Sequence, residues 1–154
     1  MLYLDITGKA PRRRCRKVIE WFKAKYMPHH HLDIKVVHRG LKRERAMGFC
    51  SVIDCDHRPR EFLIEMESTL KEHDYISILL HELWHVYQHV NGSLRDKRGI
   101  RHWKNINSDH LPYKDQPWEH EANKMEKELY ISYMKLNSDC QNNQIPFPNR
   151  LTNS

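Results

Sequence analysis

The pattern of hydrophobic and polar residues divides the chain into segments that alternate, as strands do, and segments with the three- and four-residue period of helices. Residues 2–6 alternate between apolar and polar side chains and predict a short first strand. Apolar residues then recur at helical steps between Pro11 and Pro28, which predicts a helix with a basic outer face. We predict three further strands, over residues 32–38, 48–53 and 60–66.

Helical periodicity dominates the second half of the chain. From Asp74 a wide apolar stripe predicts a helix that stops at Gly92. Residues 93–116 are polar and predict a long, mostly irregular loop. We expect a last helix to start at Pro117 and to present apolar residues as far as Leu136.

These elements predict one compact domain of the α+β class, which is also what a chain of 154 residues favours. The domain is expected to span residues 1–137, followed by a polar C-terminal tail over residues 138–154. Because the strands are few and joined by short loops, we expect a small mixed or antiparallel sheet. The sheet would pack on the last two helices.

Composition excludes several classes of protein. Lys and Arg number 26 against 20 Asp and Glu, which gives a net charge of +6. No apolar run approaches the roughly 18 residues of a membrane span, and the first residues lack the order of a secretory signal. We therefore expect a cytoplasmic protein with no membrane partner and with reduced cysteines. The unusual number is that of histidine, at 12 residues.

The chemically informative segment lies within the helix predicted from Asp74. Residues 81–85 read His-Glu-Leu-Trp-His, the H-E-x-x-H pattern. On a helix, His81 and His85 leave the same face and can share one metal ion, whereas Glu82 is rotated away and can take a proton from a metal-activated water. In a chain this rich in histidine the pattern arises by chance about 0.07 times. Its place inside the strongest helical pattern is what favours a metal site.

A third ligand is needed, and its identity decides the class of protein. The metzincin pattern would require glycine at Gln88 and histidine at Asn91, so that class is excluded. The last predicted helix instead carries Glu119-His120-Glu121-Ala122-Asn123. Glu119 and Asn123 lie on one face of this helix, and Glu121 is a competing carboxylate.

With these residues the chain resembles the gluzincins, which are zinc peptidases with H-E-x-x-H on one helix and a glutamate ligand on a later one. Among the small members, the minigluzincins, HtpX-like peptidases and ImmA/IrrE-like proteins have an E-x-E-A-[DN] pattern there. The resemblance covers about residues 60–136 and implies a zincin-like domain that binds Zn²⁺ through His81, His85 and Glu119. It also implies that Asn123 supports a ligand histidine, whereas Glu121 would be solvated or paired with a lysine.

The resemblance further implies an edge strand above the metal helix, to which an extended peptide substrate pairs. Residues 60–66 are our candidate for that strand. Zinc peptidases also use a hydrogen-bond donor to stabilise the oxyanion. Tyr113, just before the glutamate helix, is the favoured donor, with His102 and His110 as alternatives.

The expected function is therefore zinc-dependent hydrolysis of a peptide or protein, with Glu82 as general base. The alternative is a catalytically silent or regulatory zinc protein that acts on a repressor or on a nucleic-acid-associated partner. SprT-like peptidases also use H-E-x-x-H, with a histidine as third ligand, a role that His102 or His110 would fill here. Basic residues cluster in three segments, over residues 12–17, 39–45 and 95–104. We interpret them mainly as solvated surface, with nucleic-acid contact as the less favoured hypothesis.

The remaining conspicuous residues have ordinary structural interpretations. Cys50, Cys55 and His57 resemble half of a zinc knuckle, but no second Cys/His pair lies at a matching distance. We expect Trp84 and Trp118 to belong to the core. His89 lies too far along its helix for the same metal, and residues 29–31, all histidine, are expected to be solvated.

Overall fold

The computed structural model describes residues 1–142 and consists of two small sheets and three long helices. The main sheet has the strand order β1-β2-β4-β3. Its strands are β1 (Leu2–Thr7), β2 (Leu32–Arg39), β3 (Gly48–Val52) and β4 (Glu61–Glu67). β1, β2 and β4 run parallel and β3 runs antiparallel to β4, so the sheet is mixed. The predicted α+β class is confirmed.

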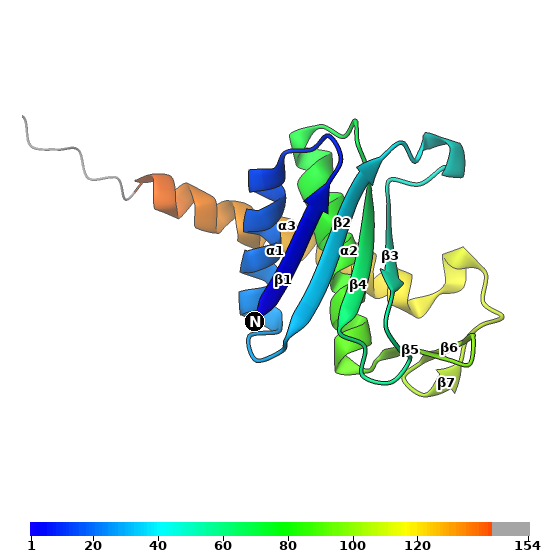
Figure 1. Ribbon diagram of the computed structural model, residues 1–154. Coiled ribbons are helices and arrows are strands. Elements are labelled where there is room, and N and C mark those ends of the chain that lie inside the picture. The colour runs from blue at the N-terminus through cyan, green and yellow to red at the C-terminus, as the bar shows by residue number, and fades with distance from the viewer. Residues whose placement is uncertain (143–154) are drawn as a thin grey trace, which may run out of the picture.

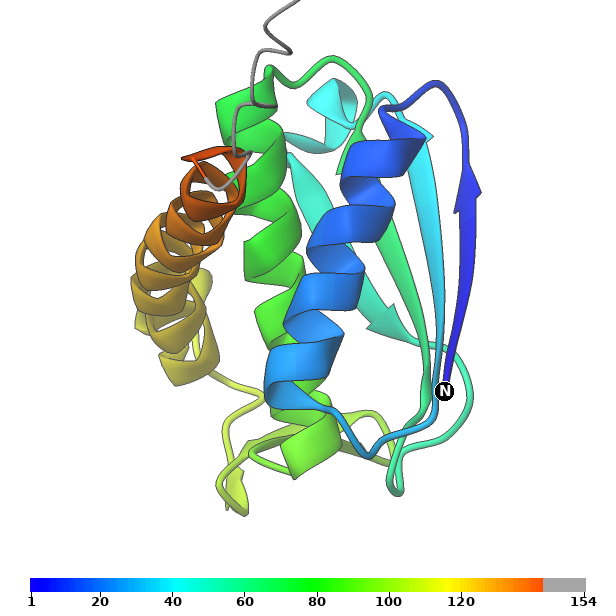
Figure 2. The same cartoon turned by 90° about the vertical axis from the view of Figure 1, so that its left-hand side faces the viewer.

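All three helices lie on one side of this sheet. α1 (Arg12–Tyr26) and α2 (Glu72–Asn91) cover its inner face, and α3 (Pro117–Asn142) packs on the side of α2 that faces away from the sheet (Figures 1 and 2). Strand alternation explains this, because Phe62, Ile64 and Met66 of β4 are fully buried under the helices. The two glutamates Glu61 and Glu65 point to the opposite face, as predicted.

α2 is the central element of the fold. It lies between the sheet and α3, and 13 of its 20 residues are buried, including the polar residues of the H-E-x-x-H pattern. The helix starts with Glu72 and Asp74 in its first turn, where carboxylates complement the helix dipole. It ends at Gly92, whose φ of 83° is the left-handed conformation that stops a helix. The predicted stop at Gly92 is therefore confirmed.

The sheet order corrects one prediction. We expected residues 60–66 to form the edge strand above the metal helix, but β4 lies inside the sheet, between β2 and β3. The edge beside α2 is β3, and no strand of the described residues pairs with its outer side. The two glutamates of β4 look like a solvated edge in the sequence, but they lie on the open face of an interior strand.

The segment predicted to be an irregular loop, residues 93–116, is also different. It forms a three-stranded antiparallel sheet of β5 (Leu94–Lys97), β6 (Ile100–Trp103) and β7 (Ile106–Asn107), followed by a single helical turn, η2 (Tyr113–Asp115). The strands are too short to show alternation. Two-residue turns connect them, and all four turn residues have positive φ, the signature of type I′ hairpins: Arg98, Gly99, Lys104 and Asn105.

The last helix is longer than expected. α3 continues to Asn142, past the predicted end of the apolar pattern at Leu136 and past the start of the predicted tail. Residues 143–154 of that tail lie outside the described residues. Within the described part of the chain, no helix combines the length and the apolar character needed to cross a membrane.

Candidate metal centre

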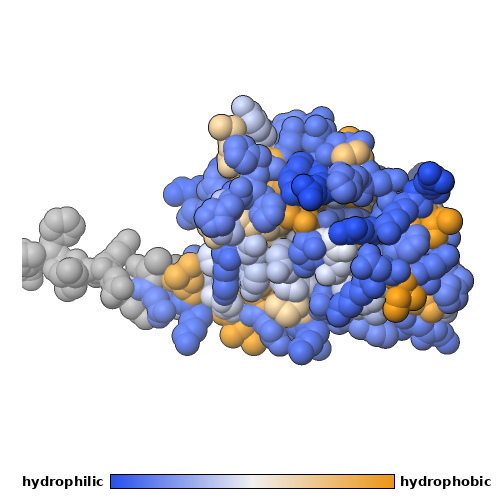
Figure 3. All heavy atoms as spheres, turned by 90° about the horizontal axis from the view of Figure 1, so that it is seen from below, coloured by the Kyte–Doolittle hydropathy of each residue, from blue (hydrophilic) through white to orange (hydrophobic). Residues whose placement is uncertain are grey.

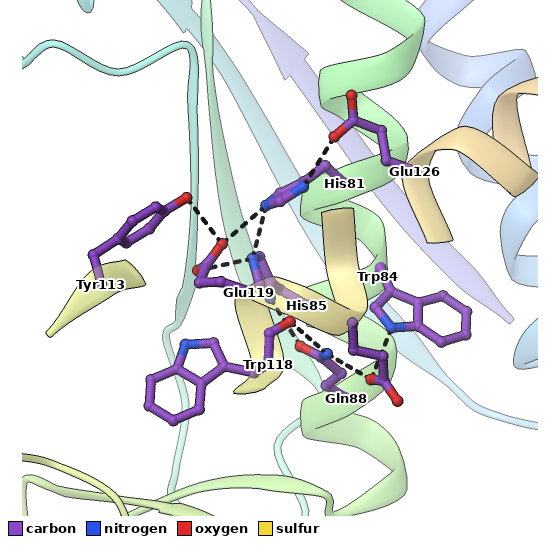
Figure 4. A network of polar contacts seen from close by, with 9 residues as sticks. His81, Trp84, His85, Gln88, Tyr113, Trp118, Glu119 and Glu126 are labelled. Atoms are coloured by element: carbon purple, nitrogen blue, oxygen red, sulfur yellow. Dashed lines mark hydrogen bonds and ion pairs between the residues drawn. The ribbon is translucent and has the colours of Figure 1, made fainter. Parts of the chain in front are cut away.

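Three side chains from two helices meet at one point. His81 and His85 project from adjacent turns of α2, and Glu119 projects from the first turn of α3 (Figure 4). The Nε2 atoms of the two histidines are 3.1 Å apart, and the Glu119 carboxylate oxygens lie 3.2 Å from His81 Nε2 and 3.3 Å from His85 Nε2. The potential ligand atoms all lie within 4.8 Å of one another, and this group could bind a metal ion.

The other nitrogen of each imidazole is held by the protein. His81 Nδ1 lies 3.2 Å from Glu126 Oε2, and His85 Nδ1 lies 2.8 Å from Gln88 Oε1. A carboxylate only accepts hydrogen bonds, so Nδ1 of His81 carries the hydrogen. The Gln88 amide nitrogen donates elsewhere, to the Trp118 carbonyl and to Glu121, so its oxygen accepts from His85. With Nδ1 hydrogen-bonded in this way, each imidazole turns its Nε2 atom toward the common point.

Three acceptors that face one another require a cation between them. Two ligands about 2.0–2.1 Å from a tetrahedral metal lie about 3.3 Å apart, close to the separations seen here. A proton on His81 also satisfies these acceptors: burial lowers the pKa of His81, but the carboxylates of Glu119 and Glu126 outweigh burial and raise the pKa to about 10. Burial likewise raises the pKa of Glu119, yet hydrogen bonds from His81 and His85 hold it well below its usual range.

The residues behind His85 form a continuous polar chain. Gln88 donates to Glu121 Oε2 over 2.7 Å, and the Trp84 indole donates to the same oxygen over 3.0 Å. Glu121 is therefore neither solvated nor paired with a lysine, as we had expected, but anchors the amide that orients His85. Trp84 and Trp118 are both buried, in agreement with their predicted place in the core.

The structure also corrects the predicted partner of a ligand histidine. Asn123 lines the same cavity as the metal ligands, but the group that accepts the hydrogen bond from His81 Nδ1 is the Glu126 carboxylate. Glu119 and Glu126 are seven residues apart, which is two helical turns, so they lie on the same face of α3 and both reach α2. This spacing is visible in the sequence and could have identified Glu126.

Glu82 lies next to this cluster, buried between α2 and the edge strand. A β-carbon added to Gly48 of β3 would lie 2.9 Å from Glu82 Oε1 and 2.9 Å from Ile78 Cγ2, so only glycine lets β3 approach the carboxylate this closely. Burial raises the pKa of Glu82, and the nearby His85 and His81 partly oppose that shift. The sequence analysis did not identify Gly48.

Tyr113 approaches the metal ligands from the other side of the cavity (Figure 4). Its hydroxyl donates to Glu119 Oε2 over 3.1 Å. Burial and the negative charge of Glu119 raise the pKa of Tyr113 to about 12, so the phenol keeps its proton at neutral pH. Of the three expected donors only Tyr113 reaches this place, because His102 and His110 do not line the cavity.

The cavity in front of these residues has a volume of about 680 Å³ and is bounded by β3, α2, η2 and the start of α3. We call it the metal-site cavity. His89 lines its far end and is buried, and burial lowers the pKa of His89 to about 4. Among the described residues, His81, His85 and Glu119 form the one cluster suited to a metal, which leaves out Cys50, Cys55, His57 and the histidines at 29–31.

Comparison with known proteins adds no assignment to this geometry. The chain matches no protein-family model, no curated protein and no solved structure.

Proposed function

We propose that this protein is a zinc-dependent peptidase of the gluzincin type. The observation that carries the proposal is the convergence of three acceptors, from His81, His85 and Glu119, with both Nδ1 atoms already fixed by hydrogen bonds. Two imidazole nitrogens and one carboxylate are a typical ligand set of catalytic zinc. Zinc in such a site supplies Lewis acidity, which activates water near neutral pH and polarises a substrate carbonyl.

The cavity favours catalysis over a structural metal. A closed structural zinc site takes four protein ligands, whereas the described residues provide three. The space in front of them, about 680 Å³, leaves room for water and substrate. This argues against the catalytically silent alternative.

Two further residues have roles in this proposal. Glu82 is the general base: its carboxylate lies beside the cluster, fixed against Gly48, and would accept a proton from the attacking water. Tyr113 donates its hydroxyl toward the cluster, where the carbonyl oxygen of a substrate develops negative charge. An extended peptide would pair with the free outer edge of β3 and pass over the metal-site cavity.

The test compares metal content and cleavage of an unfolded protein such as casein. Wild type should contain zinc, and a chelator should abolish cleavage until zinc is restored. Glu82→Gln should keep its zinc and lose about 10²- to 10⁴-fold in kcat, because a general base contributes about that much. Glu128→Gln is the matched control. Because Glu128 is exposed on α3, this variant should cleave casein like wild type.

The ligand assignment is tested separately. Glu119→Ala should weaken zinc binding by more than about 100-fold, because even residues that only orient a ligand contribute about 10- to 100-fold. Retention of full affinity in Glu119→Ala would overturn this assignment. A wild type that binds zinc and cleaves neither casein nor a candidate repressor would contradict the peptidase proposal and favour the regulatory alternative.

A further inference from the structure

A second cavity, of about 640 Å³, lies beyond the C-terminal end of α2. Figure 1 shows the three segments that surround it gathered at one end of the molecule: the loop between β3 and β4, the end of α2 and the β5–β6 hairpin. Five cationic side chains line it: Arg58, Arg60, Arg95, Lys97 and Arg98. Asp56 contributes the one carboxylate. We call it the basic cavity.

Three of these cations have no side-chain partner among the described residues. Within residues 1–142, Arg58, Lys97 and Arg98 form neither an ion pair nor a side-chain hydrogen bond. The neighbouring Arg101, in contrast, is held by Asp96 through bonds of 2.8 and 3.1 Å. Five cations against the one carboxylate of Asp56 leave an excess of positive charge in the cavity, and this excess favours an external anion.

The backbone, and not a network of side chains, brings these charges together. Arg98 occupies the first position of the β5–β6 turn with a φ of 52°, and Arg58 lies in the β3–β4 loop with a φ of 50°. Asp56 Oδ2 accepts a hydrogen bond from the Arg98 backbone nitrogen over 3.2 Å. This bond connects the two loops and leaves both guanidinium groups free to contact a ligand.

We propose that the basic cavity binds the phosphate backbone of a nucleic acid. Guanidinium groups match phosphate oxygens in a bidentate geometry, and several converging cations suit a ligand that carries several phosphates. No Phe, Tyr or Trp lines the cavity, so its lining does not include the large aromatic rings on which exposed bases stack most strongly. Binding should therefore depend on backbone charge and not on base sequence.

The surroundings favour nucleic acid over an acidic protein. Protein partners are usually anchored by buried aromatic or aliphatic groups, whereas Pro59 and Val90 are the only sizeable apolar residues of this lining. Seen from below, the molecule has a mostly hydrophilic surface with small, separate hydrophobic spots (Figure 3). The sequence clusters had included Lys97 and Arg98 but not Arg58 or Arg60, which come from a segment distant in sequence.

The site is independent of metal chemistry. His89 forms part of the wall of both cavities, but it is buried and its low pKa keeps it neutral near pH 7. Nucleic-acid binding should accordingly be the same with zinc present and with zinc removed. A failed peptidase assay would leave this proposal standing, and the reverse also holds.

The test is fluorescence anisotropy with a labelled DNA duplex and a double variant, Arg58→Asn with Arg98→Asn. Asn tolerates positive φ, so the change removes two charges without straining the backbone. The dissociation constant should rise at least about 10-fold, and the slope of log K against log salt should become shallower by about 1.8. A duplex of scrambled sequence should bind wild type equally well.

The matched control is Arg45→Asn with Lys104→Asn. These residues also have positive φ, of 54° and 48°, and do not line the basic cavity. The dissociation constant of this control variant for the DNA duplex should stay within about threefold of the wild-type value. Equal losses in the two pairs would mean that net charge alone holds the duplex, which would overturn the proposal.

Two other outcomes would also overturn it: wild type that does not bind the duplex, and wild type that prefers polyglutamate or a phosphorylated peptide to it. Circular dichroism would establish that each variant is folded. Lys97→Gln provides a third variant, at a residue of β5 and not of a turn. Like the double variant, it should weaken binding of the duplex.

Discussion

Two cavities lie along α2, and they differ in whether their charged and polar side chains are paired with other side chains. In the metal-site cavity each of the three ligand residues has a side-chain partner within hydrogen-bond distance. His81 is held by Glu126, His85 by Gln88, and Glu119 by Tyr113. In the basic cavity Arg58, Lys97 and Arg98 have no such partner in the described chain.

The difference lies in what positions the functional groups. Around the metal ligands, side chains from α2, α3 and η2 position one another, so the geometry is prepared before any ligand arrives. In the basic cavity, turn backbone brings the charges near one another and the ligand has to order them. Truncating a neighbour should therefore affect the first cavity much more than the second.

The largest expected effect comes from truncating Glu126, the hydrogen-bond partner of His81. Glu126→Ala should lower zinc affinity by about 10- to 100-fold, because the imidazole loses the bond that fixes its tautomer and orientation. Competition with a chromophoric chelator would measure this. Asn123→Ala is the matched control, one turn earlier on the same face of α3 and in the same cavity, and should stay within about twofold. If Asn123→Ala were the more damaging change, the sequence prediction would be right and our correction wrong.

A smaller effect is expected where the backbone approaches the Glu82 carboxylate. Gly48→Ala would place a methyl group 2.9 Å from Glu82 Oε1, and displacement of this oxygen should lower kcat by about 10-fold or more while zinc content is unchanged. Gly40→Ala is the control, because its β-carbon meets no atom within 4 Å. Equal activity in both variants would mean that Glu82 tolerates movement, and the metal-site cavity would be less rigidly built than we infer.

The sequence predicted well what depends on local period. The helical stripe of α2 placed His81 and His85 on one face, and the alternation of β4 placed Phe62, Ile64 and Met66 under the helices. A ligand pair one turn apart requires only a helix, so a short motif suffices to predict it. The third ligand required more, because the resemblance and not the spacing selected Glu119.

The sequence predicted poorly what depends on how elements pack. Gln88 entered the sequence analysis only as the place where a metzincin glycine is missing. Its i, i+3 spacing from His85 allows the contact, but its bond to the Trp118 carbonyl, which turns the amide oxygen toward His85, depends on the packing of α3. The role of Gly48 depends on the approach of β3 to α2, and the edge position of β3 on a pairing with β4. The contacts of Gly48 and β3, like that of Gln88 with Trp118, join residues distant in sequence, so periodicity carries no information about them.

The short hairpins were missed for a different reason. Strands of four residues or fewer show too little alternation to detect, but their turns had a signal, since Arg98-Gly99 and Lys104-Asn105 end in the residues that favour positive φ. Attention to these dipeptides would have divided the predicted loop into strands. The same turns determine where Arg98 lies, and with it the basic cavity.

The smallest expected effect tests whether Arg98 is held by backbone alone. Arg98→Asn should change the free energy of unfolding by no more than about 0.5 kcal/mol, and in the stabilising direction, because Asn-Gly is the preferred sequence of a type I′ turn. Urea unfolding would measure it, with Lys104→Asn as the equivalent change in the next turn. Gln88→Ala should instead cost about 1–3 kcal/mol, because it leaves buried polar groups without partners. A loss above about 1 kcal/mol in Arg98→Asn would mean that the fold itself uses this guanidinium, and the contrast between the two cavities would fail at the residue on which it depends most.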